Sequence, residues 1–197
     1  ETFEWSCKIP DLSQTNSRLK HLAFGTLNPF YILLLKSDSL YAFLVYESIK
    51  ADDTSSIFTN YQTYTEPFLG LFIDASGQIE FTMRGDNSYS PSDLDFPNIE
   101  GDGLYHVYGA GYYKSNNSRE LRVDGFSQVQ IDLNSINFTS GQDTIIGSGH
   151  YDRYIKGNLK EVLFYQDTEL DNKTIIKTQS YLSSKWNLTS TVDSDGD

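Results

Sequence analysis

The chain has 197 residues, with 15 Lys and Arg against 27 Asp and Glu, and a formal net charge of −12. Charge this negative argues against nucleic-acid partners and anionic membrane surfaces, both of which need clustered cations. The one Cys excludes an internal disulfide framework and cysteine-built zinc or iron–sulfur sites, and no apolar run approaches the roughly 20 residues that span a bilayer.

Most segments, taken in chain order, predict β-strands, and 12 Phe, 14 Tyr and 2 Trp supply a core for them. Residues 40–46 are almost continuously apolar, which predicts a strand covered on both faces. The apolar run at 31–35 is strand-sized, and His21 lies in a strand-like stretch. The remaining predicted strands show alternation or short apolar runs at 3–7, 68–73, 79–83, 104–108, 120–123, 126–131, 144–147 and 159–165.

Turn and loop signals separate these strands. Residues 74–77 (DASG) and the pair Asp124 and Gly125 each predict a hairpin, because glycine accepts the positive φ that tight turns require. Residues 88–103 carry two Pro, two Gly and four acids, and predict a long surface loop. Residues 52–56 predict a second polar insertion.

One helix is predicted near the C-terminus, capped by Asp171 or Asn172. We expect this helix to pack on the sandwich through an apolar face, which is made of Ile175, Ile176, Tyr181, Leu182 and Trp186. Strands spaced about every 8–12 residues favour a sandwich or jelly roll. We therefore predict an all-β fold over residues 1–190, a two-sheet antiparallel jelly-roll β-sandwich with one C-terminal helix.

Both ends of the sequence look cut from a longer chain. Residues 191–197 alternate Asp with small residues, as calcium loops of the D-x-D-x-D-G kind do, but lack the later acidic ligand. We interpret them as an acidic linker that is either simply solvated or begins a calcium-binding repeat.

Several motifs together resemble the laminin-G-like, concanavalin A-like jelly rolls of bacterial multidomain surface proteins. Residues 103–107 (GLYHV) and 121–125 (LRVDG) are similar to their W-H-H-V and L-Y-V-D-G segments. Residues 145–147 (IIG) and 154–165 (YIKGNLKEVLFY) resemble I-G-G and F-x-G-x-I-D-E-V-x-I-Y-N. Residues 181–188 (YLSSKWNL) resemble the Y-L-x-x-K-W-G-L closing element, and 3–5 (FEW) fits the opening strand.

The resemblance implies a non-catalytic module for glycan or protein binding, often with a calcium ion at one rim. It gives the motif residues structural roles. Gly125 permits a turn, Gly157 allows a close approach or a bulge, and Glu161 anchors a neighbour. His106 matches a strand position of the family and is expected to be a structural histidine with satisfied hydrogen bonds.

The sequence holds no clear catalytic pattern. The E-x-D-x-x-E strand of related glycoside hydrolases is absent. Residues 119–122 (RELR), with the preceding segment 112–114 (YYK), superficially match the R-x-E-L-R and Y-x-K strands of alginate lyases. The order is reversed and no Gln-x-His strand supplies a base, so we interpret that match as chance.

Two predicted loops, residues 86–95 and 148–153, carry the candidate binding residues, because loops on a rigid sandwich commonly hold ligands. Aromatic rings with planar polar groups suit sugars, which selects Asn87, Tyr89, His150, Tyr151 and Arg153 as ligand-binding candidates. Calcium prefers carboxylate and carbonyl oxygens, which selects Asp93, Asp95 and Asp152 as candidate ligands for a rim calcium ion. The alternative is that these acidic loops serve solubility alone.

The first functional hypothesis is a secreted or cell-surface, monomeric module that recognises glycans without catalysis, for adhesion or polysaccharide targeting, with or without calcium. The second is a protein–protein interaction or spacer module that contacts other domains of the parent chain. The third is a polysaccharide-active enzyme. No nucleic-acid partner and no membrane insertion are expected.

Overall fold

The computed structural model describes residues 18–23, 31–34, 39–49, 54–59, 68–84, 94–96, 102–130, 143–147, 154–166 and 169–190. For 18–23, 31–34, 94–96 and 143–145 it describes the backbone alone. The predicted strand at 3–7, with Cys7, and the acidic residues 191–197 lie outside the described residues.

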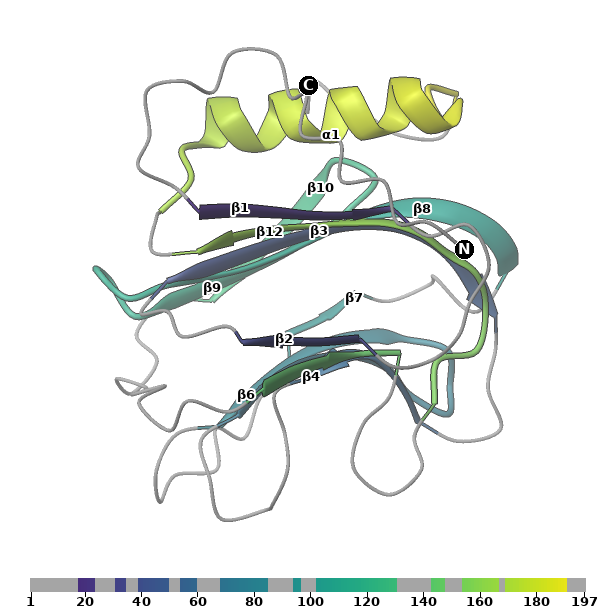
Figure 1. The fold of residues 1–197 in the computed structure, drawn as a ribbon, viewed down its shortest axis with the longest axis horizontal. Coiled ribbons are helices and arrows are strands. Elements are labelled where there is room, and N and C mark those ends of the chain that lie inside the picture. The colour runs from purple at the N-terminus through teal and green to yellow at the C-terminus, as the bar shows by residue number, and fades with distance from the viewer. Residues whose placement is uncertain are drawn as a thin grey trace.

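Two six-stranded antiparallel sheets face each other, and helix α1 (Asn172–Trp186) lies on the outer face of one of them (Figure 1). We call that sheet the helix-covered sheet. Its strand order is β1 (Arg18–Ala23), β12 (Leu159–Gln166), β3 (Leu40–Ile49), β8 (Asp102–Tyr113), β9 (Ser118–Val123) and β10 (Phe126–Gln130). The second sheet has the order β2 (Tyr31–Leu34), β11 (Asp143–Ile146), β4 (Ser55–Thr59), β5 (Phe68–Ile73), β6 (Ile79–Arg84) and β7 (Leu94–Phe96). This arrangement confirms the predicted sandwich with one C-terminal helix.

Strand β3 explains the continuous apolar sequence at 40–46, because both of its faces are covered. Ala42, Leu44 and Tyr46 point into the core between the sheets. Tyr41, Phe43 and Val45 point to the other side, where they belong to a second core under α1. The alternation of a strand thus serves two apolar layers at once.

The predicted tight turns are confirmed. Asp124 and Gly125 both have positive φ, of 50° and 95°, as a two-residue hairpin between right-twisted strands requires. Gly77 closes the hairpin between β5 and β6 with φ of 91°. Gly157 has φ of 128°, and a Cβ atom there would lie 2.2 Å from the Glu47 carbonyl oxygen, so this position needs the close approach that only glycine permits.

Two loop predictions are wrong in part, at residues that the structure describes as strands. Ser55 and Ser56 begin strand β4 and are buried, because Ile57 and Phe58 carry the segment into the core. The predicted loop at 88–103 contains β7, where Leu94, Asp95 and Phe96 pair with β6, and the last two residues of that loop begin β8. Alternation over three residues was masked by the surrounding Pro, Gly and Asp.

Helix α1 begins as predicted, because the Asp171 side chain accepts a 2.7 Å hydrogen bond from the Thr174 backbone N–H. It ends at Asn187, which adopts the left-handed conformation with φ of 58°. Ile175 and Leu182 are buried in the core under the helix, as the apolar pattern predicted. No described helix is both long and apolar enough to cross a membrane.

Candidate functional site

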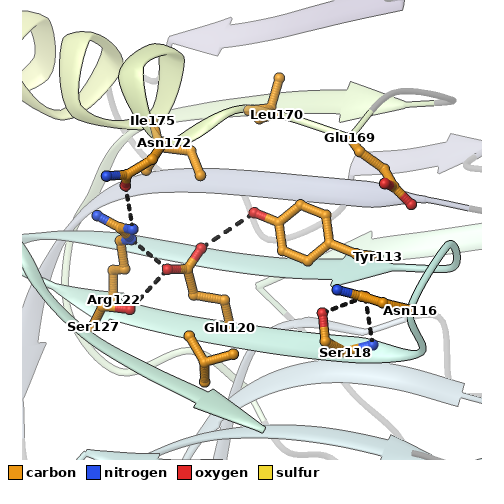
Figure 2. Close-up of a pocket in the computed structure, with 11 residues that line it drawn as sticks. Tyr113, Asn116, Ser118, Glu120, Arg122, Ser127, Glu169, Leu170, Asn172 and Ile175 are labelled. Carbon is orange, nitrogen blue, oxygen red and sulfur yellow. Dashed lines mark hydrogen bonds and ion pairs between the residues drawn. The ribbon is translucent and has the colours of Figure 1, made fainter. Parts of the chain in front are cut away.

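An open pocket of about 410 Å³ lies on the outer face of the helix-covered sheet, between strands β8–β10 and the start of α1 (Figure 2). Its polar lining includes Asn116, Ser118, Glu120, Arg122, Ser127, Glu169 and Asn172, and its apolar lining includes Tyr113, Val129, Leu170 and Ile175. The pocket therefore combines an aromatic ring with several hydrogen-bonding groups.

Strand register brings these side chains together. Glu120 of β9 is paired with Gly111 of β8 on one side and with Val129 of β10 on the other. Arg122, two residues along β9, is paired with Gly109 and Ser127 in the same way. Because residues two apart share one face of a strand, Glu120 and Arg122 both point to the helix side.

Glu120 is the centre of a dense polar network, although it is only 4% exposed. Its Oε1 accepts from Arg122 Nε at 2.6 Å and from the Ser127 hydroxyl at 2.7 Å. Its Oε2 accepts from the hydroxyls of Tyr41 and Tyr113, each at 3.2 Å. Figure 2 shows Tyr113 and Arg122 approaching the carboxylate from opposite sides. Both oxygens are thus held by two donors each, which fixes the carboxylate in place.

Burial and the negative charge of Glu120 raise the pKa of both tyrosines well above its ordinary value. Burial is the larger cause for each. Tyr41 and Tyr113 therefore remain protonated at neutral pH and act as donors to Glu120.

Arg122 connects this network to the helix. One terminal nitrogen donates a 2.6 Å hydrogen bond to Asn172 Oδ1 at the first position of α1. Across the pocket, the Asn116 Oδ1 accepts from the Ser118 backbone N–H at 3.1 Å and from its hydroxyl at 2.6 Å. These hydrogen bonds use the amide oxygens of Asn116 and Asn172, and each side chain also carries amide N–H groups that can donate to a further polar group.

At the other end of the helix, side chains of α1 cover a second buried glutamate. Glu161 of β12 is fully buried and accepts 2.9 Å from Lys185 Nζ and 2.6 Å from Trp186 Nε1. Burial alone lowers the pKa of Lys185, but the hydrogen bond and charge of Glu161 outweigh it and raise that pKa. The prediction that Glu161 anchors a neighbour is confirmed, and the neighbour is α1.

His106 has the structural role that the sequence predicted. Its Nδ1 lies 2.5 Å from Asp124 Oδ2, and its Nε2 lies 3.2 Å from both carboxylate oxygens of Asp102. Asp124 also accepts from the Val107 backbone N–H at 2.9 Å. Burial alone lowers the pKa of His106, but the hydrogen bonds and charges of Asp124 and Asp102 outweigh it and raise that pKa.

The sequence-predicted loop candidates are not brought into this pocket by any described contact. Asn87, Tyr89, Asp93, His150, Tyr151, Asp152 and Arg153 lie outside the described residues. Asp95 lies in β7, where the structure describes its backbone alone. Among the described residues, no group of three or more His, Cys, Asp or Glu side chains is arranged to hold a metal ion.

Sequence reasoning missed the pocket because it treated Glu120 and Arg122 only as a chance match to a lyase strand. The structure separates the residues of that match. Arg119 points into the core between the sheets and donates to the Phe81 carbonyl oxygen at 2.9 Å, whereas Glu120 and Arg122 point to the helix side. The usable signal was the spacing of Glu120 and Arg122 two residues apart in a strand.

The fold is that of the laminin-G-like, concanavalin A-like jelly rolls, and comparison with solved structures bears this out. The CBM40 module of the Ruminococcus gnavus IT-sialidase, solved with alpha2,3 sialyllactose bound, superposes with a TM-score of 0.62 at 12% identity. The match covers 82% of this chain and 97% of that module.

Two further structures share the fold. A leech intramolecular trans-sialidase, in complex with 2,7-anhydro-Neu5Ac, matches with a TM-score of 0.59 at 16% identity, over 80% of this chain and 27% of the enzyme. Domains LG4-5 of the mouse laminin alpha1 chain match with a TM-score of 0.51 at 15% identity, over 78% and 43% of the two chains. At these identities the likeness shows the fold alone. No family model matches the chain, and no curated protein matches it.

Proposed function

We propose that this chain is a non-catalytic glycan-binding module of a secreted or cell-surface protein, and that the pocket beside α1 holds the glycan. The observation that carries the proposal is the pocket itself, in which the Tyr113 ring stands beside the Glu120 and Arg122 pair. The shared fold supports it, because the CBM40 module with that fold binds sialyllactose.

The chemistry of the pocket suits a sugar. An aromatic ring can pack against the C–H face of a sugar ring, while amide N–H groups and hydroxyls pair with its hydroxyls. Arg122 keeps guanidinium N–H groups beyond those used for Glu120 and Asn172, since a guanidinium has five. A sugar carboxylate is a matched partner for them, so sialylated glycans are the first probes.

Titration calorimetry with alpha2,3- and alpha2,6-sialyllactose, and with lactose as the matched sugar without a carboxylate, tests the proposal. We expect sialyllactose to bind more tightly than lactose, and Arg122→Gln to weaken that binding by about tenfold or more. Lys173→Gln, which removes an exposed cation at the same end of α1, should leave the affinity unchanged. If a broad panel of acidic and neutral glycans yields no binding, the alternative of a protein-interaction or spacer module gains instead.

The absence of catalysis is part of this proposal. Both oxygens of Glu120 are occupied by donors, as suits a carboxylate that orients its neighbours more than one that must gain or lose a proton. We expect no turnover of sialosides or acidic polysaccharides by the purified chain. Release of product that disappears in Glu120→Gln would contradict this part of the proposal.

We also propose a calcium ion held by Asp93, Asp95 and Asp152, on the preference of calcium for carboxylate oxygens. Asn87, Tyr89, His150, Tyr151 and Arg153 remain proposed as further ligand contacts from the same two loops. Calorimetric titration with calcium, on the parent chain and on the double variant Asp93→Asn, Asp95→Asn, tests this calcium site. Equal calcium binding by both proteins would remove the assignment.

A further inference from the structure

Tyr41 lies beneath the pocket and does not line it. Its side chain is fully buried, on the helix-facing side of β3. It nevertheless contacts two residues that line the pocket. The centroid of its ring lies 6.1 Å from that of Tyr113, and its hydroxyl lies 3.2 Å from Glu120 Oε2. Tyr41 therefore touches two pocket residues from a place that a ligand does not reach.

Two glycines of β8 make this reach possible. Tyr41 is paired with Gly111, which is in turn paired with Glu120 on the next strand. A Cβ atom at Gly111 would lie 2.3 Å from the Tyr41 ring, and one at Gly109 would lie 3.0 Å from its hydroxyl oxygen. The ring thus lies across the bare backbone of β8 and spans from β3 to β9. A side chain at Gly111 would displace the ring, and one at Gly109 would crowd its hydroxyl.

The hydrogen bond from Tyr41 affects Arg122 indirectly, because both residues contact the Glu120 carboxylate. Tyr41 and Tyr113 hold one carboxylate oxygen, and Arg122 and Ser127 hold the other. Without the Tyr41 hydroxyl, Tyr113 is the one described donor left to Oε2, so the carboxylate that Arg122 contacts is less restrained. Fixing such groups before a ligand arrives lowers the entropic cost of binding.

We propose that Tyr41 is a positioning residue for glycan binding, holding Glu120 and thereby Arg122 in place from beneath through the glycine gap in β8. This proposal rests on the proposed function for its effect on affinity. Its effect on the network itself is independent of any ligand.

Tyr41→Phe tests the proposal, because it removes the hydroxyl and leaves the ring in the glycine gap. The matched control is Tyr165→Phe, which removes another buried hydroxyl in the core under α1, from a residue that does not line the pocket. We expect Tyr41→Phe to shift the NMR resonance of the Arg122 Nε–H and speed its exchange with solvent, and to weaken sialyllactose affinity about tenfold. Tyr165→Phe should do neither.

A purely structural role for the Tyr41 hydroxyl would lower the stability of Tyr41→Phe and leave its sialyllactose affinity unchanged. In a Glu120→Gln background, Tyr41→Phe should weaken affinity no further, since the carboxylate through which it acts is gone. The proposal is overturned if the Arg122 resonance and the affinity of Tyr41→Phe equal those of the parent. A parent chain that binds none of the glycans refutes the proposed function, and the Arg122 resonance then still decides whether Tyr41 holds the network.

Discussion

Two buried glutamates lie on the same face of the same sheet, one near each end of α1, and their surroundings differ. Glu161 under the last turn is covered by Lys185 and Trp186 of the helix itself. Glu120 near the first turn is held from the sheet, by Tyr41, Tyr113, Arg122 and Ser127, and it lies at an open pocket.

The partners of the two glutamates distinguish a contact that attaches the helix to the sheet from the open pocket that we propose as a binding site. At Glu161 the helix supplies the partners, so the contacts close the surface and stabilise the fold. At Glu120 the helix joins the polar network through Asn172, which accepts a hydrogen bond from Arg122, and the surface stays open. The same side-chain type is thus a structural anchor at one end and, at the other, the support of the pocket that we propose binds a glycan.

The largest expected effect on stability is at the closed end. Glu161→Ala removes the acceptor of Lys185 and Trp186 and leaves both donors without it. We expect the free energy of unfolding to fall by about 3 kcal/mol, the lower end of the usual range for breaking a buried pair, because the Lys185 side chain is a third exposed. Urea unfolding followed by circular dichroism measures this.

Glu161→Gln removes the charge but keeps an acceptor for Trp186, so it can be compared directly with Glu120→Gln. It should lower stability by less than Glu161→Ala and leave glycan affinity unchanged, whereas Glu120→Gln should weaken affinity. Equal losses of glycan affinity in Glu161→Gln and Glu120→Gln would contradict the different roles assigned to the two glutamates.

The next largest effect is expected at the glycine gap. Gly111→Ala places a Cβ atom 2.3 Å from the Tyr41 ring, so the ring must move, at a cost of about 1–3 kcal/mol in stability. Glycan affinity should fall with it. Gly70→Ala in β5 is the matched control, since its Cβ would lie 2.4 Å from the Phe72 ring, away from the pocket. A fall in affinity of the same size in Gly70→Ala would mean that any loss of packing weakens binding.

A smaller effect is expected at the helix start. Asp171→Ala removes the N-cap acceptor of the Thr174 N–H and should lower stability by about 1 kcal/mol. Because Asn172 follows the cap directly, fraying there should also weaken glycan affinity slightly. Asp171→Asn, which retains a capping oxygen, should restore most of both. Thermal unfolding with calorimetric titration distinguishes the variants.

The pH dependence of stability should come from a third region, around His106. Because the folded-state pKa of His106 is raised, its contribution is fully present below the unfolded-state pKa of about 6.5. It is lost as pH rises through the folded-state pKa. Unfolding free energies measured from pH 5 to pH 9 should therefore decline more for the parent chain than for His106→Gln. An identical decline in both would assign the pH dependence to other groups.

The sequence predicted those features that depend on neighbours in the chain. The doubly covered strand at 40–46, the turn at Asp124 and Gly125 and the cap at Asp171 all follow from local pattern. The pocket network could not be predicted in this way. Tyr41 and Glu120 are 79 residues apart and meet through the register of β3, β8 and β9, whereas Arg122 and Asn172 are 50 apart and meet where α1 packs on the sheet. The short strand β7 was missed because three residues carry too little periodicity against a loop-like composition.

The most direct test of the glycan-binding pocket is an NMR titration of the isotope-labelled chain with alpha2,3-sialyllactose. We expect the side-chain amide resonances of Asn116 and Asn172 and the Nε–H resonance of Arg122 to shift together and to saturate with one affinity. Saturable shifts confined to residues 86–95 and 148–153, with these three side chains unmoved, would contradict it and place the ligand in the loops instead.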